Sequence, residues 1–300
     1  MSPVPFTLRQ LEYFDAIAAE GTLLAAAERC HVSASALTLA IDELERHLSL
    51  QLLVRRKGRG VTLTPAGSRV LSHARRVLAS VDSLVSDAWE AGTGFTGRFG
   101  VGCFSTLAPF FLPGIMEDFA RDHPGLTIEL VEASAPELHE LLLQGRIDAA
   151  LMYSVDVSQR LTFEPVHAYE PHVIVAEGHD LAHRDSVHLR ELLAEPLIML
   201  DLSPTRQNTE SIFATLGLQP RIGHRTASFE LARCLVGRGL GYAILFQRPE
   251  SAVTYDGHSV RILEIADQVP GTVVGLARPH GAPRTARLQA LEEFLQQEHA

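Results

Sequence analysis

The stretch that most constrains the fold is residues 22–48, TLLAAAERCHVSASALTLAIDELERHL. It predicts two helices joined by a tight turn at Cys30-His31-Val32. Thr22 and Ser33 are suitable N-caps for them, because their side-chain oxygens accept hydrogen bonds from free backbone N–H groups. Four residues at spacings of four, three and four form the apolar stripe of the second helix: Leu37, Ile41, Leu44 and Leu48. An Ala-rich helix, a turn and a helix with a small polar leading end together predict a helix-turn-helix.

The opposite face of the second helix is more polar. At about 100° per residue, Ser35, Leu39, Asp42 and Arg46 lie on this face, with Thr38 on its flank. In a helix-turn-helix this face enters the DNA major groove. An ordinary helical hairpin inside a core would show the same spacing, so the residues that follow decide between the two.

A basic hairpin follows the helix pair. Strand-like residues 52–54 and 61–64 flank the loop Arg55-Arg56-Lys57-Gly58-Arg59-Gly60, which holds the only lysine of the chain. Its cations attract a phosphate backbone, and its glycines let the main chain approach closely. The hairpin therefore favours the DNA-binding interpretation.

The stretch FTLRQLEYFDAIAAEGTLLAAAERCHVSASALTLAIDELERHLSLQLLVRRKGRGVTLTPAG resembles the winged helix-turn-helix of the LysR-type transcriptional regulators over about sixty residues without a gap. Where that family usually has Ser-Gln-Pro-Ala, this chain has Ser33-Ala34-Ser35-Ala36, and it has Leu39 and Ala40 where Arg and Gln are common. The resemblance implies that phosphates are held by the wing and that the second helix faces the groove. The DNA-binding residues implied are Ser33, Ser35, Thr38, Leu39, Arg55, Arg56 and Arg59. Ala34 and Leu39 offer apolar contacts to thymine methyl groups, with DNA shape supplying further specificity.

Length and charge point to more than one domain. Three hundred residues exceed a usual single core, so two or three domains are expected. Residues 1–90 carry equal numbers of acidic and basic residues, and the net charge of −10 therefore lies in residues 91–300. No run approaches the roughly 18 apolar residues of a membrane span, and MSPVPFTLRQ lacks the regions of a signal peptide. We expect a cytoplasmic protein without membrane contact.

A long helix is predicted after the hairpin. Thr64-Pro65 is a helix start, and apolar residues then recur in a heptad pattern to about residue 91. The seam comprises Val70, Ala74, Val77, Val81, Leu84 and Ala88, widened by Leu71, Leu78 and Val85. So broad an apolar face either packs on its own domain or pairs with a second copy, as in the family's linker helix. We favour a homodimer or homotetramer, which also presents recognition helices to several half-sites.

Gly-rich residues 92–97 mark the best domain boundary. Beyond them we expect strands at 99–104, 126–132, 148–153, 173–176, 197–202, 241–246, 260–264 and 273–277, and helices at 105–121, 136–144, 189–193, 209–216, 229–236 and 284–298. This alternation predicts an α/β fold with a parallel sheet. The resemblance implies a winged helix-turn-helix (6–64), a linker helix (65–93) and a two-lobed α/β effector domain like a periplasmic binding protein (95–300). Lobe I would comprise 95–165 and 268–300, and lobe II 166–267.

Hydroxyl groups follow several of the expected strands. Ligands of open α/β sheets bind beyond the carboxyl ends of strands, where helix N-termini point. The candidate effector-binding residues are Ser105, Thr106, Ser134, Tyr153, Ser203, Thr205, Arg206, Ser228 and Phe246. Each hydroxyl alone is more simply an N-cap. Together they favour a cleft for a small anionic or polar planar effector.

Three alternatives compete with an effector-controlled regulator. Cys103 and Cys234 could form a redox switch in the same fold, although single cysteines usually serve packing. A solute-binding protein or an enzyme could also carry two such lobes. We find no nucleophile elbow, phosphate-binding glycine motif or metal motif, and we expect no catalytic residue, metal or cofactor. The leading hypothesis is a regulator in which an effector changes the angle between the lobes, and thereby the assembly of dimers on DNA.

Overall fold

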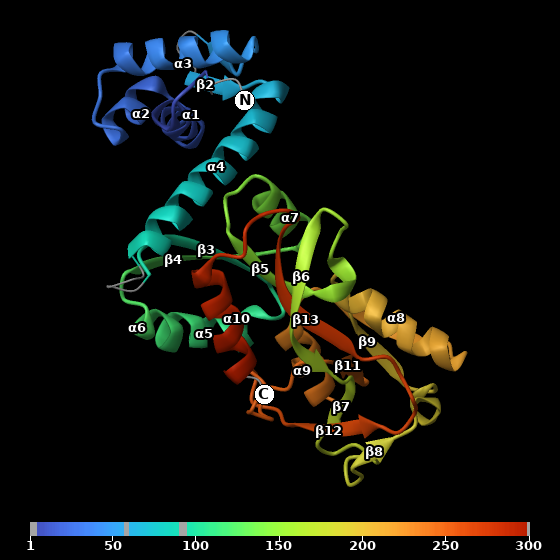
Figure 1. Cartoon of the computed structure of the whole chain (residues 1–300). Coiled ribbons are helices and arrows are strands. Elements are labelled where there is room, and N and C mark those ends of the chain that lie inside the picture. Colours follow the sequence, from blue (N-terminus) through green and yellow to red (C-terminus); the bar gives the residue numbers. More distant parts are fainter. Residues whose placement is uncertain (1–4, 57–59, 90–94, 299–300) are drawn as a thin grey trace.

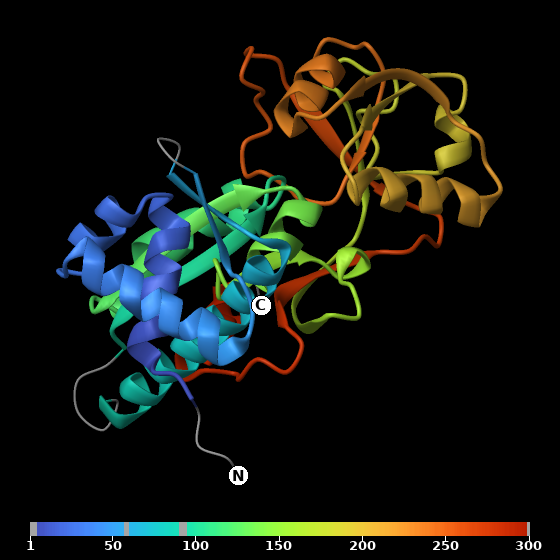
Figure 2. The same cartoon turned by 90° about the horizontal axis from the view of Figure 1, so that it is seen from above.

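The computed structural model describes residues 5–56, 60–89 and 95–298. A small helical domain stands at one end, and helix α4 (Pro65–Trp89) leads from it to two α/β lobes (Figure 1). Seen from above, the helical domain lies over the first lobe and away from the second (Figure 2). No helix in the described part of the chain is both long and apolar enough to cross a membrane.

The helical domain contains the predicted helix-turn-helix. Its helices are α1 (Leu8–Glu20), α2 (Leu23–Arg29) and α3 (Ala34–Leu48). The Thr22 and Ser33 hydroxyls accept hydrogen bonds from the third residue of α2 and of α3, so both predicted caps are confirmed. Leu37, Ile41 and Leu44 are fully buried, which confirms the predicted stripe.

The wing consists of strands β1 (Leu53–Arg56) and β2 (Gly60–Leu63), which pair antiparallel. The Val61 N–H donates to the carbonyl of Gly21 (2.8 Å), which ties the wing to the turn between α1 and α2. A Cβ at Gly60 would lie 2.5 Å from that carbonyl oxygen, and Gly60 has a φ of +78°. Glycine is therefore required for this approach.

Helix α4 divides its apolar seam between two environments. Leu71 and Ala74 are buried in the core of the helical domain, and Val70 and Leu78 pack against that core. Val77 and Leu84 are 44% and 67% exposed. The first half of the helix thus packs on its own domain, while part of the second half leaves apolar surface uncovered.

The first lobe, lobe I, is built on a five-stranded sheet of order β4-β3-β5-β13-β6. Its strands are β3 (Gly97–Phe104), β4 (Leu126–Ala133), β5 (Ala149–Tyr153), β6 (Leu161–Tyr169) and β13 (Thr272–Pro279). The first three are parallel, as predicted, and β13 runs antiparallel between β5 and β6. Its helices are α5 (Ala108–Gly114), α6 (Ala120–Asp122), α7 (Ala135–Leu143) and α10 (Ala286–Glu298).

Two predictions for this lobe are corrected. The helix expected at 105–121 starts at Ala108. Ile115–Phe119 is π-helical and begins two residues after Pro113, which lacks the N–H of a regular helix. Strand β6 was not predicted, because Pro165 interrupts its pattern. Proline is tolerated at this position because β6 is an edge strand whose register shifts opposite Val274 and Gly275. The lobe boundary expected at residue 165 therefore falls inside β6.

The second lobe, lobe II, contains a four-stranded sheet of order β11-β7-β12-β8 and a parallel pair, β9 and β10. The strands are β7 (His172–Ala176), β8 (Ser186–Val187), β9 (Pro196–Leu200), β10 (Arg221–Thr226), β11 (Ala243–Leu245) and β12 (Val260–Ile265). A bridge between Leu197 and Tyr242 joins the two groups. Helices α8 (Thr205–Leu216) and α9 (Phe229–Gly237) cover them. Helix α8 starts four residues earlier than predicted, and β8 and β10 were missed; β10 is a largely exposed edge strand without an apolar pattern.

Candidate DNA-binding and effector-binding sites

The exposed face of α3 carries the predicted groove-facing residues. Ser35 and Leu39 are exposed, Leu39 by 63%, while Thr38 is half-buried on the flank. The Ser33 hydroxyl caps the helix (3.1 Å to the Ala36 N–H) and lies 3.0 Å from the Ser35 hydroxyl. Ser33 therefore acts mainly as the N-cap of α3, and Ser35 and Leu39 are exposed side chains of this face.

The wing faces the same helix. Arg55 forms an ion pair with Asp42, one turn beyond Thr38 on the exposed face of α3. The pair neutralises a carboxylate that would otherwise repel a phosphate. Arg56 lies in β1, but its side chain is outside the described part of the chain, as are Lys57 and Arg59.

A buried polar cluster lies where the lobes meet. The Tyr153 hydroxyl accepts a hydrogen bond from the Gln247 amide (2.7 Å) and shares one with the Thr106 hydroxyl (3.1 Å). Thr106 follows β3 and Tyr153 ends β5, while Gln247 follows β11 of the other lobe. Thr205, 3% exposed at the start of α8, has a hydroxyl without a well-formed hydrogen bond among the described residues. We call Thr106, Tyr153, Thr205 and Gln247 the inter-lobe cluster.

The cluster is uncharged. Burial raises the pKa of Tyr153 above its usual value, so the hydroxyl stays protonated. Also between the lobes, Phe110 of α5 and Phe229 of α9 stack edge to face, with ring centroids 5.8 Å apart. The Asn208 amide also donates to the Thr272 hydroxyl (3.4 Å) between the lobes. These contacts add to those of the cluster in joining the two lobes.

The other predicted effector residues are engaged elsewhere. Ser134 forms a capping box with Glu137 and is exposed. Ser203 accepts from the Gln207 amide (2.9 Å), and Ser228 caps α9. These hydroxyls show the simpler N-cap and turn roles.

Three predicted residues remain. Ser105 is half-buried beside Thr106, and Phe246 is buried in the core of lobe II. Arg206 binds Asp201 (3.0 Å), and Arg225 binds the other oxygen of that carboxylate (3.4 Å). Arg206 also lies 3.8 Å from Glu210, so the one predicted cation is already paired with carboxylates.

Gln247 was missed by the sequence analysis. It directly follows the predicted strand 241–246, and its position satisfies the same strand-end rule as the hydroxyls. The strand-end rule, applied to amide side chains as well as hydroxyls, selects Gln247.

Comparison with known families identifies both parts of the chain. Residues 8–68 match the family "Bacterial regulatory helix-turn-helix protein, lysR family", and residues 92–300 match "LysR substrate binding domain". The chain belongs to the LysR family of transcriptional regulators.

Relatives within the LysR family span the whole chain. The DNA-binding transcriptional dual regulator OxyR of Escherichia coli (strain K12) is 30% identical over 291 residues, covering 96% of this chain and 94% of that protein. A hydrogen peroxide-inducible genes activator of Dickeya chrysanthemi is 29% identical over 293 residues, covering 97% and 95%. The crystal structure of HinK, a LysR family regulator from Pseudomonas aeruginosa, shares 32% identity over 98% of each chain with a TM-score of 0.66. The predicted family and fold class are therefore confirmed.

The cysteines of this LysR protein occupy unlike sites. Cys103 is fully buried in β3, and burial raises the pKa of its thiol. Cys234 is half-buried in α9 of the other lobe, with its sulfur 3.9 Å from a Glu230 oxygen. All three cysteines, including Cys30, are free thiols. Deep burial disfavours the thiolate that oxidation of Cys103 requires.

Proposed function

We propose that this chain binds a specific operator through α3 and its wing, and that a small effector bound between the lobes changes how its oligomer sits on DNA. Operator binding would place it in the cytoplasm. The observation that carries the proposal is the exposed face of α3. Its opposite face is fully buried, and the wing is fixed beside it by the bond between Val61 and Gly21. Such a helix has no other described surface to cover and is presented for a groove.

We assign two kinds of DNA contact. Ser33, Ser35, Thr38 and Leu39 face the bases, with Leu39 offering an apolar surface to thymine methyl groups. Arg55, Arg56 and Arg59 hold phosphates, which position the helix without reading sequence. The Asp42 carboxylate restrains Arg55 on the helix side of this surface.

The test is a salt series of operator binding, with DNA from upstream of the chain's own gene. Arg55→Ala should weaken binding to all sequences and lower the slope of log K against log salt by about 0.9 for each phosphate that is no longer neutralised. Asp42→Asn should strengthen binding, because it frees Arg55 and removes a negative charge. The control is Arg121→Ala, which removes an exposed arginine of lobe I and should change neither the operator affinity nor the salt slope. An Arg55→Ala protein with the parental slope would refute the phosphate role.

We further propose that the effector binds at the inter-lobe cluster. Three hydroxyls and one amide suit a polar, hydrogen-bonding ligand. The neutralisation of Arg206 by Asp201 favours a neutral or weakly charged compound over a strong anion. Ser105 borders this site, whereas Ser134, Ser203 and Ser228 act mainly as caps. After a thermal-shift screen of polar metabolites, Thr106→Val should shift the effector dose–response and leave operator affinity without effector unchanged.

The exposed apolar residues of α4 support an oligomer. We propose that Val77 and Leu84 pair with a second copy, giving a homodimer and, through further contacts, a homotetramer. Leu84→Glu should shift the sedimentation of the free protein toward the monomer. An unchanged oligomer would assign the interface elsewhere.

A redox-sensing regulator is the second candidate, favoured by relatives that are named as hydrogen peroxide-inducible genes activators. The buried Cys103 argues against it. Operator binding before and after hydrogen peroxide, in the parental protein and in Cys234→Ser, separates the two. A peroxide response that Cys234→Ser abolishes would establish the redox function. We expect no change of operator binding with peroxide, and no catalytic activity.

A further inference from the structure

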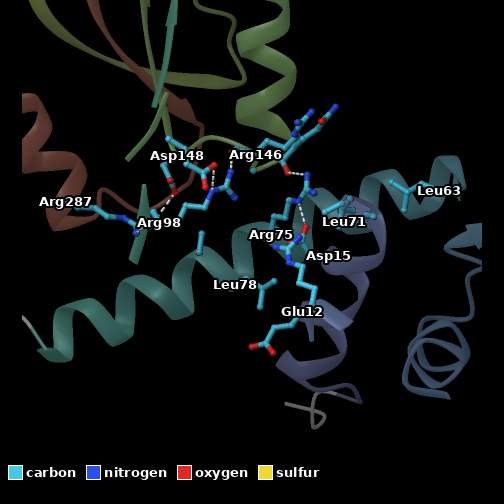
Figure 3. A pocket seen from close by; sticks show the side chains of 17 residues that line it. Glu12, Asp15, Leu63, Leu71, Arg75, Leu78, Arg98, Arg146, Asp148 and Arg287 are labelled. Carbon is cyan, nitrogen blue, oxygen red and sulfur yellow. Dashed lines mark hydrogen bonds and ion pairs between the residues drawn. The ribbon is translucent and has the colours of Figure 1, made fainter. Parts of the chain in front are cut away.

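Arg75, in the middle of α4, contacts two domains at once. Its Nε atom lies 2.6 Å from Asp15 Oδ1 in α1 of the DNA-binding domain. Its Nη1 atom donates to the Gln144 carbonyl (3.4 Å), in the loop between α7 and β5 of lobe I. Figure 3 shows the side chain between Asp15 on one side and the lobe I loop on the other.

The lobe I loop is shaped for this contact. Gly145 has a φ of +64°, and a Cβ there would lie 2.8 Å from the Cβ of Arg75. Backbone and arginine stem therefore approach more closely than any other residue at position 145 would allow. The approach is a second observation, independent of the hydrogen bond, that joins lobe I to α4 at Arg75.

The contact is narrow. Two hollows, of about 760 and 600 Å³, adjoin it, and Arg75 and Gly145 line both. The apolar core of the DNA-binding domain and that of lobe I share no residue among those described. A contact through Arg75 with hollows on either side allows more rotation than a broad apolar interface would.

Two of the charged pairs around the hollows lie within lobe I. Arg98 binds Glu129 (2.7 Å), and Arg287 binds Asp148 (3.4 Å). Both partners of each pair belong to the lobe. Arg75, by contrast, reaches from α4 both to Asp15 of α1 and to the Gln144 carbonyl of lobe I.

We propose that Arg75 is the positioning residue that sets the angle between the DNA-binding domain and lobe I, and through it the half-site spacing that the oligomer accepts. The proposal rests on the proposed function, that the chain binds operator DNA as an oligomer. Through its bonds to Asp15 and Gln144, a movement of lobe I is transmitted to α1 and so to the recognition helix.

The first experiment measures the angle directly. Nitroxide labels on Glu28→Cys (α2) and Glu140→Cys (α7), in a Cys30→Ser/Cys234→Ser background, report the distance between domains by pulsed dipolar spectroscopy. The parental protein, mixed with an excess of unlabelled protein so that distances within one protomer dominate, should give one narrow distance. Arg75→Gln should broaden it and add a longer component.

Two further variants separate the two bonds of Arg75. Asp15→Arg/Arg75→Asp restores an ion pair between α1 and α4, but a carboxylate cannot donate to the Gln144 carbonyl, so the distribution should stay broad. Gly145→Ala should broaden it with Asp15 and Arg75 intact. Arg69→Gln, an exposed arginine earlier on α4, is the matched control and should leave it narrow.

The second experiment uses operators whose half-sites are moved apart by inserted base pairs. The parental protein should discriminate strongly between the original and lengthened operators. In Arg75→Gln, the ratio of the affinities for the original and the lengthened operators should fall about fivefold, the change expected from loss of the one hydrogen bond to lobe I. Its affinity for the original operator should stay within about threefold of the parental value. General destabilisation would instead lower affinity for all spacings alike.

Two results would overturn the proposal: a narrow, parental distance distribution in Arg75→Gln, or equal broadening in Arg69→Gln. Failure of the proposed function is a different result. In that case the parental protein itself shows no saturable operator binding, whatever the distance measurement gives.

Discussion

Replacing Tyr153 by phenylalanine tests whether the inter-lobe cluster holds the effector domain together. The change removes one hydroxyl that bonds Thr106 at 3.1 Å and Gln247 at 2.7 Å. Gln247 and Thr106 are both almost fully buried, so each loses a partner that water cannot replace. An unsatisfied buried group costs about 1–3 kcal/mol, and we expect a loss of about 2 kcal/mol in the free energy of unfolding.

Related substitutions in the cluster should have smaller or overlapping effects on the free energy of unfolding. Thr106→Val removes one bond and keeps the shape of the side chain, so it should cost about 1 kcal/mol. Because Thr106→Val and Tyr153→Phe remove the same bond, the double variant should cost about 1 kcal/mol less than the sum. At about 2–4 °C per kcal/mol for a domain of this size, Tyr153→Phe should lower the melting temperature of the effector domain by about 4–8 °C.

Differential scanning calorimetry of the full chain, with operator binding measured alongside, is the assay. Tyr242→Phe is the matched control: Tyr242 is also fully buried, but its hydroxyl has no hydrogen-bond partner in the described structure. That change should be neutral or stabilising. Operator affinity should stay parental in all these variants. A Tyr153→Phe protein as stable as Tyr242→Phe, or fully additive costs in the double variant, would refute the reasoning.

Three further predictions concern the wing, the thiols and acid stability. Gly60→Ala should lower the free energy of unfolding by about 1–3 kcal/mol and weaken operator binding, because the residue has positive φ and the new Cβ would meet a carbonyl. Gly257→Ala, at φ +83° with open space around it, is the control for backbone strain alone in melting and binding assays. Cys103 should react with a disulfide reagent only after unfolding, and Cys234 already in the native protein; rapid native labelling of Cys103 would contradict its burial. Burial lowers the pKa of His172 to about 3, so the folded state binds fewer protons than the unfolded state between about pH 3 and 6.5. His172 should therefore lower stability as pH falls through this window, by up to about 1.4 kcal/mol per unit, and urea titrations of His172→Gln should show a shallower pH dependence than the parental protein.

The helix-turn-helix was predictable because its determinants are local. Caps at Thr22 and Ser33 and a stripe of Leu37, Ile41 and Leu44 act within a few residues of chain, and the structure confirms each. The alternation of strands and helices after residue 97 was predictable for the same reason. Strand β6 was not, since Pro165 is acceptable only at a sheet edge, and an edge is a property of the assembled sheet.

The effector site was predictable in part. The strand-end rule selected Thr106, Tyr153 and Thr205, which the structure gathers in one cluster, but it also selected hydroxyls that cap helices locally. No sequence rule distinguished them, because the difference lies in whether a second lobe comes within hydrogen-bond distance.

The helix-turn-helix, the wing, the long helix and the α/β class follow from local sequence, because hydrogen-bonded caps and apolar periodicity involve residues within a few turns of one another. Three features depend on the folded molecule: the half of α4 that packs on its own domain, the bond from Gln247 to Tyr153, and the contacts of Arg75 with Asp15 and the Gln144 carbonyl. These bonds join residues 60 to 94 positions apart. Their geometry depends on how whole domains dock, which no local pattern encodes.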